Sequence, residues 1–143
     1  MTTELRIEED AASLFPGDGE MARRCRAMDW SRTPLGPTEL WPPALRTMVR
    51  TVIGSPFPIL LWCGPSLTLV YNDGYRGVLG VKHPSALGQS GRAVWSEIWP
   101  DIEPMFDWDD SSHTTFAENA RFQMDRADGL LGEAFFTFAL SPI

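Results

Sequence analysis

The chain has 143 residues, 43% of them hydrophobic and 22% charged, which is the composition of one globular domain of ordinary size. Its net charge of −7 argues against nucleic acid as a partner. The two cysteines are far apart in sequence, and no Cys and His cluster has zinc spacing, so we expect reduced thiols and no metal site. No apolar run approaches the roughly 20 residues of a membrane span, and no signal peptide opens the chain. These features predict a soluble, cytoplasmic protein.

The first part of the chain is predicted to be helical after an acidic leader. Residues 1–18 are acidic, end in Pro-Gly-Asp, and are typical of a loosely ordered segment. Residues 19–56 are predicted to form an N-terminal helical extension. In it, Met21, Cys25 and Met28 recur at helical spacing within 20–29, and 44–53 is a second amphipathic helix. The prolines between the two helices prevent one continuous helix.

The remaining residues, 57–143, alternate between strand and short-helix patterns. The apolar segments 57–62 and 67–71, joined by Gly-Pro-Ser, predict an antiparallel hairpin. A short helix is expected at 74–79, and further helical pieces at 93–98 and 102–108. Strand character returns at 113–124 and 133–140, on either side of a loop at 125–132. This order predicts an α+β domain with an antiparallel sheet and a helical insertion halfway.

The sequence Asn72-Asp73-Gly74 forms a polar corner between the second predicted strand and the helix that follows it. Asn and Asp side chains favour turns because they bond to nearby backbone amides, and Asp73 is placed to cap the following helix. A catalytic site would need a partner His, Lys or second carboxylate cluster, which the pattern lacks. We therefore interpret Asn72 and Asp73 as a structural turn.

Several segments together resemble a PAS sensory domain. They are LWCGPSLTLVYND, then GYRGVLG, then HPSALGQSGRAVWSEIW, and finally EAFFTFALSPI. A preceding DWSRTPLGPTELWPPALRT is similar to a segment found before the N-terminal PAS domains of bacterial sensor histidine kinases. The resemblance covers roughly residues 20–143. It implies a PAS-like antiparallel sheet with short helices on one face, and it gives Asn72 the role of holding the turn.

The resemblance also limits which cofactors we expect. Flavin-binding members carry a reactive Cys after the second strand, where this chain has GQSGRAVWSEIW, and Cys63 belongs to the first strand. Haem-binding members use a His on the long helix before the third strand, and His113 falls beyond it; His83 is interpreted as a loop residue. No cofactor is therefore expected, although an unknown small-molecule ligand is compatible with the fold. The aromatic side chains that are candidates either for a ligand pocket or for ordinary core are Trp62, Tyr71, Tyr75, Trp95, Trp99, Phe106, Phe122 and Phe136.

Two functions remain open at this stage. The first is a sensory input domain of a two-component signal-transduction protein, controlling a C-terminal effector that the resemblance implies is a histidine kinase. The second is a ligand-free dimerisation module. The candidate homodimer interface is the apolar face of the second helix, Leu45, Met48, Val49, Val52 and Ile53, which could equally pack on the chain's own sheet. We do not expect an enzyme: Asp73, Glu97, Asp101 and Glu103 read as surface charge.

The strand count gives one further expectation. In PAS domains a fifth strand lies between the first and the fourth, and this chain stops directly after its fourth strand-like segment. We therefore expect the PAS-like domain, residues 57–143, to lack its final strand. The first strand would then have an open edge.

Overall fold

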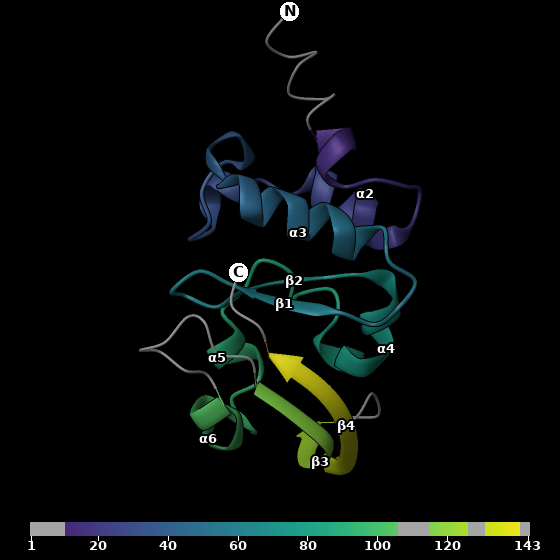
Figure 1. Ribbon diagram of the computed structural model, residues 1–143, viewed down its shortest axis with the longest axis vertical. Helices are drawn as coiled ribbons and strands as arrows, with labels where there is room; N and C mark the ends of the chain where they lie inside the picture. The colour runs from purple at the N-terminus through teal and green to yellow at the C-terminus, as the bar shows by residue number, and fades with distance from the viewer. Residues whose placement is uncertain (1–10, 106–114, 126–130, 141–143) are drawn as a thin grey trace, which may run out of the picture.

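The computed structural model describes residues 11–105, 115–125 and 131–140. It is a mixture of short helices and antiparallel strands, so the α+β class predicted from the sequence is confirmed (Figure 1). The strands are β1 (Leu60–Cys63), β2 (Thr68–Tyr71), β3 (Thr115–Asp125) and β4 (Leu131–Leu140). The α-helices are α2 (Glu20–Ala27), α3 (Pro43–Ile53), α4 (Arg76–Leu79), α5 (Gly91–Val94) and α6 (Trp99–Ile102). Single 3-10 turns are η1 (Trp30–Arg32), η2 (Thr38–Leu40), η3 (Asp73–Tyr75), η4 (Gly80–Lys82) and η5 (Glu103–Met105).

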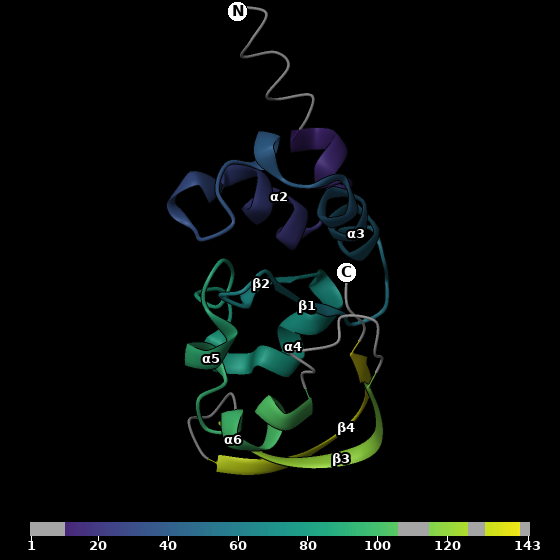
Figure 2. The ribbon, with the colours of Figure 1, turned by 60° about the vertical axis from the view of Figure 1, so that its left-hand side comes forward.

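The β1–β2 hairpin is the middle layer of the molecule. It lies between the N-terminal helices α2 and α3 on one side and α4 and α5 on the other (Figures 1 and 2). The strands are antiparallel, with Leu61 opposite Val70 and Trp62 opposite Leu69, as the sequence predicts. The outer edge of β2 is also paired, because the segment 88–91 exchanges backbone hydrogen bonds with Leu67 and Leu69. This pairing fixes the start of α5 beside the hairpin.

The first strand is shorter than the sequence suggests. The prediction began it at Phe57, but β1 starts at Leu60. Pro58 has no backbone N–H to give to a ladder, and the Phe57 side chain is 72% exposed. The short helices also differ in their bounds. α5 begins before the predicted 93–98 and overlaps only its start, and α6 begins at Trp99, before the predicted 102–108, with Pro100 in the first turn, where a proline is tolerated.

The strands do not form the single sheet that the resemblance implied. β1 pairs with β2 and β3 pairs with β4, which gives two separate two-stranded sheets among the described residues. The β3–β4 ladder is antiparallel and has one irregularity, between Ala117 and Ala120. Among the described residues, no strand pairs with the edge of β1 opposite β2.

The N-terminal helical extension has a small aromatic core of its own. Phe15, Trp30 and Trp41 meet with ring centroids 5.2–6.2 Å apart. Each indole N–H has an acceptor, since Trp30 donates to Cys25 O and Trp41 donates to Gly36 O, both at 2.9 Å. The motif DWSRTPLGPTELWPP therefore builds this fold: its tryptophans fill the cluster, and its Pro-Pro pair opens α3.

The extension and the hairpin share one continuous core. Val49 and Val52 of α3 are 0% and 1% exposed, and α3 contacts both β1 and β2. The same buried cluster contains Leu61 and Val70. The ordered part of the chain also begins earlier than predicted. Residues 11–14 form a helical turn, and Leu14 and Phe15 are buried in the core. The prediction that residues 1–18 form a loosely ordered leader is therefore wrong for these residues. Residues 1–10 lie outside the described part.

Candidate functional site

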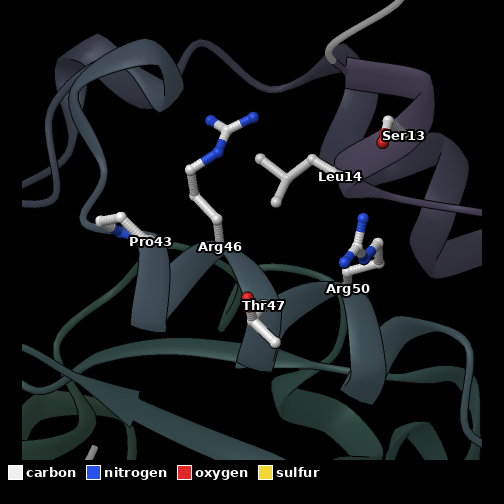
Figure 3. Close-up of a pocket in the computed structure, with 6 residues that line it drawn as sticks. All are labelled: Ser13, Leu14, Pro43, Arg46, Thr47 and Arg50. Atoms are coloured by element: carbon white, nitrogen blue, oxygen red, sulfur yellow. The ribbon is translucent and has the colours of Figure 1, made fainter.

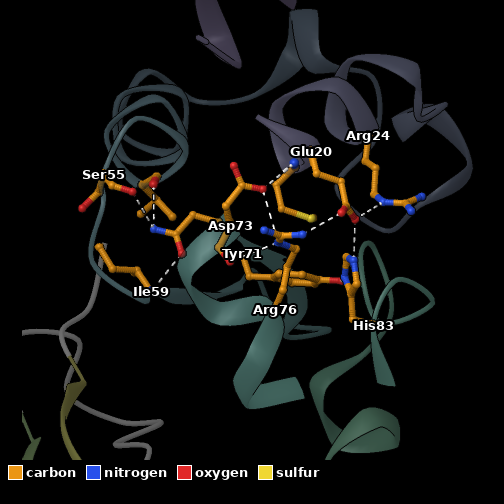
Figure 4. A network of polar contacts seen from close by, with 11 residues as sticks. Glu20, Arg24, Ser55, Ile59, Tyr71, Asp73, Arg76 and His83 are labelled. Atoms are coloured by element: carbon orange, nitrogen blue, oxygen red, sulfur yellow. Dashed lines mark hydrogen bonds and ion pairs between the residues drawn. The ribbon is translucent and has the colours of Figure 1, made fainter. Parts of the chain in front are cut away.

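The corner after β2 is built around Asn72, which is 0% exposed. Its side-chain amide nitrogen donates to Phe57 O at 2.6 Å, Val52 O at 3.0 Å and Ser55 O at 3.3 Å. Its side-chain oxygen accepts from Ile59 N at 3.1 Å. One carboxamide thus ties the end of α3 and the link to β1 onto the end of β2. Ser55 and Ile59, two of its partners, are labelled in Figure 4. Asn72 thus bonds to backbone groups of the segment 52–59, which is geometry compatible with the predicted turn role.

Asp73 caps a helix, but a different one from the helix predicted. Its Oδ1 accepts from the backbone N–H of Met21, in the first turn of α2, at 2.9 Å. The turn that follows Asp73 in sequence receives no side-chain cap. The first-turn amides of a helix have no acceptor within the helix, so an external carboxylate stabilises them. The Asp73 carboxylate can approach the start of α2 closely because residue 19 is glycine. A Cβ at that position would lie 2.0 Å from Asp73 Oδ2.

A cluster of charged side chains joins α2 to the same corner (Figure 4). The Glu20 carboxylate accepts from Arg24 Nε at 2.7 Å, from an Arg76 terminal nitrogen at 2.7 Å, and from His83 Nε2 at 2.5 Å. The Arg76 guanidinium also donates to Asp73 O at 3.2 Å. Hydrogen bonds from Arg24 and His83 and the nearby positive charges hold the pKa of Glu20 at about 2, against a usual 4.5.

His83 connects this carboxylate to the interior. Its Nδ1 lies 2.8 Å from the Tyr71 hydroxyl, and the two rings meet edge to face. A carboxylate only accepts hydrogen bonds, so His83 Nε2 carries the hydrogen toward Glu20, and in the neutral ring Nδ1 accepts from Tyr71. Burial raises the pKa of Tyr71 to about 12, so its hydroxyl stays protonated.

The chain Tyr71–His83–Glu20 has the connectivity of a hydroxyl activated by an imidazole and a carboxylate. Tyr71 is 0% exposed, however, so its hydroxyl does not face solvent in this structure. Catalysis requires the reacting group to be within reach of substrate. The contacts instead fasten the extension to the hairpin, since Glu20 belongs to α2 and Tyr71 to β2. The sequence predicts His83 to be a loop residue and does not indicate its contact with Glu20, because contacts between residues 63 apart leave no local pattern.

Four of the residues predicted to line a ligand pocket form two pairs. Trp62 and Trp99 lie near each other, with ring centroids 6.1 Å apart, and the Arg92 guanidinium lies over Trp99 at 5.5 Å. Trp62 also packs directly on Gly91, where a Cβ would lie 2.2 Å from its ring. Tyr71 and Tyr75 form a second pair, 6.5 Å apart, toward His83. Phe106, Phe122 and Phe136 have side chains outside the described part.

Trp95, like Tyr71, is a buried member of the predicted pocket set. Its side chain is 2% exposed, and the Lys82 ammonium lies 5.4 Å from the ring centroid. The indole N–H has no hydrogen-bond acceptor among the described residues. Buried polar groups are nearly always paired with protein or water, so this N–H is a group that a bound molecule could satisfy.

A pocket of about 250 Å³ lies elsewhere, between the helical turn 11–14 and α3 (Figure 3). It is lined by Ser13, Leu14, Pro43, Arg46, Thr47 and Arg50, none of which was predicted to bind a ligand. The Arg46 guanidinium donates to Thr38 O at 2.6 Å and so braces η2 against α3. The pocket belongs to the N-terminal layer and is remote in sequence from the aromatic residues after β1.

The apolar face of α3 is directed mostly into the protein's own core. Val49, Val52 and Ile53 are buried against the hairpin, Leu45 is half-buried, and Met48 remains 37% exposed. Of the two alternatives left open by the sequence, packing on the chain's own sheet accounts for the three buried residues. A dimer interface on this helix would have to use its outer residues.

Groups that could support other chemistry are few in the described part of the chain. Cys25 and Cys63 are unpaired and buried, and burial raises the pKa of each thiol to about 12, which makes both unreactive. Residues 11–105, 115–125 and 131–140 contain no cluster of three His, Cys, Asp or Glu side chains arranged for a metal ion. The helices in these ranges are also too short or too polar to cross a bilayer.

Comparison with protein-family models, with curated proteins and with solved structures finds no match for this chain. The functional interpretation therefore depends on the residues themselves.

Proposed function

We propose that this chain is a sensory or regulatory input module of a bacterial signal-transduction protein, of the PAS type found in sensor histidine kinases. The observation that carries the proposal is the corner built on Asn72, where a hairpin ends in a buried carboxamide and passes into short helices. The order of elements also agrees with the resemblance: helices, hairpin, short helices, hairpin. The buried Tyr71–His83–Glu20 chain gives no support to an enzymatic role.

In this proposal the ligand site lies on the face of the hairpin that carries Trp62, toward α5 and α6. Trp62 and Trp99 supply apolar surface, and the Trp95 N–H supplies a donor without an acceptor among the described residues. Apolar pockets with few polar groups are the usual form of a small-molecule site. A molecule bound there would bias an effector, which we propose is a histidine kinase C-terminal to this chain in the cytoplasm.

Native mass spectrometry of the protein purified from its host tests this proposal. A retained small molecule, lost from the Trp95→Phe variant but kept by Trp41→Phe, supports sensing, because Trp41 belongs to the separate aromatic core of the extension. A ligand-free dimer supports the alternative, an interaction module. A ligand-free monomer that stays monomeric at high concentration contradicts both.

We also propose that the module carries neither flavin nor haem. The segment after β2 has no cysteine, and among the described residues His83 already contacts Glu20 and Tyr71. Visible absorbance of the freshly purified protein tests this, and a flavin or Soret band that survives gel filtration would refute it.

A further inference from the structure

Two adjacent residues, Lys82 and His83, connect the layers on either side of the hairpin. The Lys82 ammonium lies 2.9 Å from Glu97 Oε1, between α5 and α6, and 5.4 Å from the Trp95 ring centroid. His83, the next residue, contacts Glu20 of α2 and Tyr71 of β2. One dipeptide thus contacts the helical extension with one side chain and the aromatic side of the hairpin with the other.

Both contacts are shielded from water. The side chains of Lys82 and Glu97 are 12% and 18% exposed, and those of His83 and Glu20 are 15% and 29% exposed. Exposed ion pairs contribute little because solvent and salt screen them, whereas partly buried pairs are screened less. Among the described residues, Arg32 and Asp29 form an ion pair in which both side chains are more than half exposed, at 87% and 59%. It provides a natural control.

The backbone between these contacts is held at both ends. His83 N donates to Gly80 O at 3.1 Å, which closes η4, and Ala86 N donates to Lys82 O at 2.9 Å. His83 also has hydrogen-bond partners for both ring nitrogens. A displacement of the Lys82 backbone would therefore also shift the backbone of His83 and alter the contacts of its ring.

We propose that Lys82-His83 is a coupling element that transmits changes at Trp95 and Glu97 to Glu20 and the N-terminal extension, and the reverse. The inference deepens the proposed function, because it names the route by which an occupied aromatic site would be sensed by the helices. It requires no ligand, so it can fail while the sensing proposal stands, and it can hold where no ligand is found.

A double-mutant cycle between Glu20→Gln and Glu97→Gln measures the coupling. Residues in separate parts of a protein normally have additive effects, within about a factor of two in the unfolding equilibrium constant. We expect the unfolding equilibrium constant of the double variant to differ by a factor of at least about three from the product of the two single effects. The matched control is a second cycle between Arg32→Gln and Glu97→Gln. In this cycle the unfolding equilibrium constant of the double variant should equal the product of the single effects within a factor of about two.

The indole ¹⁵N–H resonance of Trp95, assigned with the Trp95→Phe variant, gives a readout in the folded protein. We expect Glu20→Gln to move this resonance and Arg32→Gln to leave it in place. If Glu20→Gln folds too poorly for a spectrum, His83→Gln breaks the same contact. The proposal requires both results, so an additive cycle or an unmoved Trp95 resonance overturns it.

Discussion

Replacing Asn72 with Ala should destabilise the protein more than the loss of an ordinary turn residue. The change removes the acceptor of Ile59 N–H and the donor to Phe57 O, and neither group has another partner among the described hydrogen bonds. Val52 O keeps its bond from Ser55 N. Each net hydrogen bond contributes about 1 kcal/mol, and a buried group left unpaired costs about 1–3 kcal/mol. We therefore expect a loss of about 2–4 kcal/mol, above the roughly 0.5–2 kcal/mol of a cap residue.

Urea unfolding followed by circular dichroism measures this loss. With an m value of about 2 kcal/mol per M, the midpoint should fall by roughly 1–2 M. The matched control is Gln89→Ala, which removes a carboxamide from an exposed position and should change stability by less than about 0.5 kcal/mol. An Asn72→Ala midpoint equal to that of Gln89→Ala would refute the proposed role of this side chain.

The Asn72→Asp variant separates hydrogen bonding from shape. At neutral pH its carboxylate would face three carbonyl oxygens, so we expect a loss at least as large as that of Asn72→Ala. The repulsion raises the folded-state pKa of the introduced Asp above its unfolded value, so stability is lost as pH rises through that pKa. The variant should accordingly recover in mild acid relative to Asn72→Ala, because the protonated acid can donate to Phe57 O. A variant as stable as the wild type at pH 7 would contradict this reasoning.

The remaining predictions concern the helix cap, two glycines and the charged cluster. Asp73→Ala should lower the free energy of unfolding by about 0.5–2 kcal/mol and speed amide exchange in the first turn of α2. Asp73→Asn keeps an oxygen acceptor and should lose less stability, so equal losses in the two variants would rule out capping. Gly91→Ala would place a methyl group 2.2 Å from the Trp62 ring and should cost about 1–3 kcal/mol in thermal unfolding, while Gly77→Ala, with open space in α4, should stabilise by up to about 1 kcal/mol. The lowered pKa of Glu20 contributes stability that is fully present above pH 4.5 and is lost as pH falls toward 2. The free energy of unfolding should therefore fall less steeply with acid in Glu20→Gln than in the wild type, and parallel curves would exclude this contribution of Glu20.

The helix α2 and the β1–β2 hairpin were predictable because each has a short-range signal. The spacing of Met21 and Cys25 predicted α2, and both residues are buried as that spacing requires. The Gly-Pro-Ser turn between two apolar segments predicted the β1–β2 hairpin. Periodicity and turn chemistry act over a few residues, so they can be read from the chain without knowledge of its tertiary structure.

Only part of the candidate site was predictable, because the contacts that complete it join segments far apart in the sequence. Asn72 was identified because Asn is typical of turns, but the helix that Asp73 caps lies 52 residues earlier in the chain. The cluster of Glu20, Arg76 and His83 also joins distant segments, and no spacing rule brings these residues together. The division into two separate sheets was missed because strand patterns indicate faces, not which strands become neighbours.

The shared core of α3 and the hairpin has a consequence for synthesis on the ribosome. The segment 11–53 emerges before the hairpin, so Val49 and Val52 stay uncovered until β1 and β2 have been synthesised, about 20 residues later. At a translation rate of about 5–20 residues per second, this exposes an apolar helix face for roughly 1–4 seconds. The nascent chain is therefore open to aggregation between the completion of α3 and the closing of the hairpin, and a chaperone that binds apolar helix faces would act in this interval.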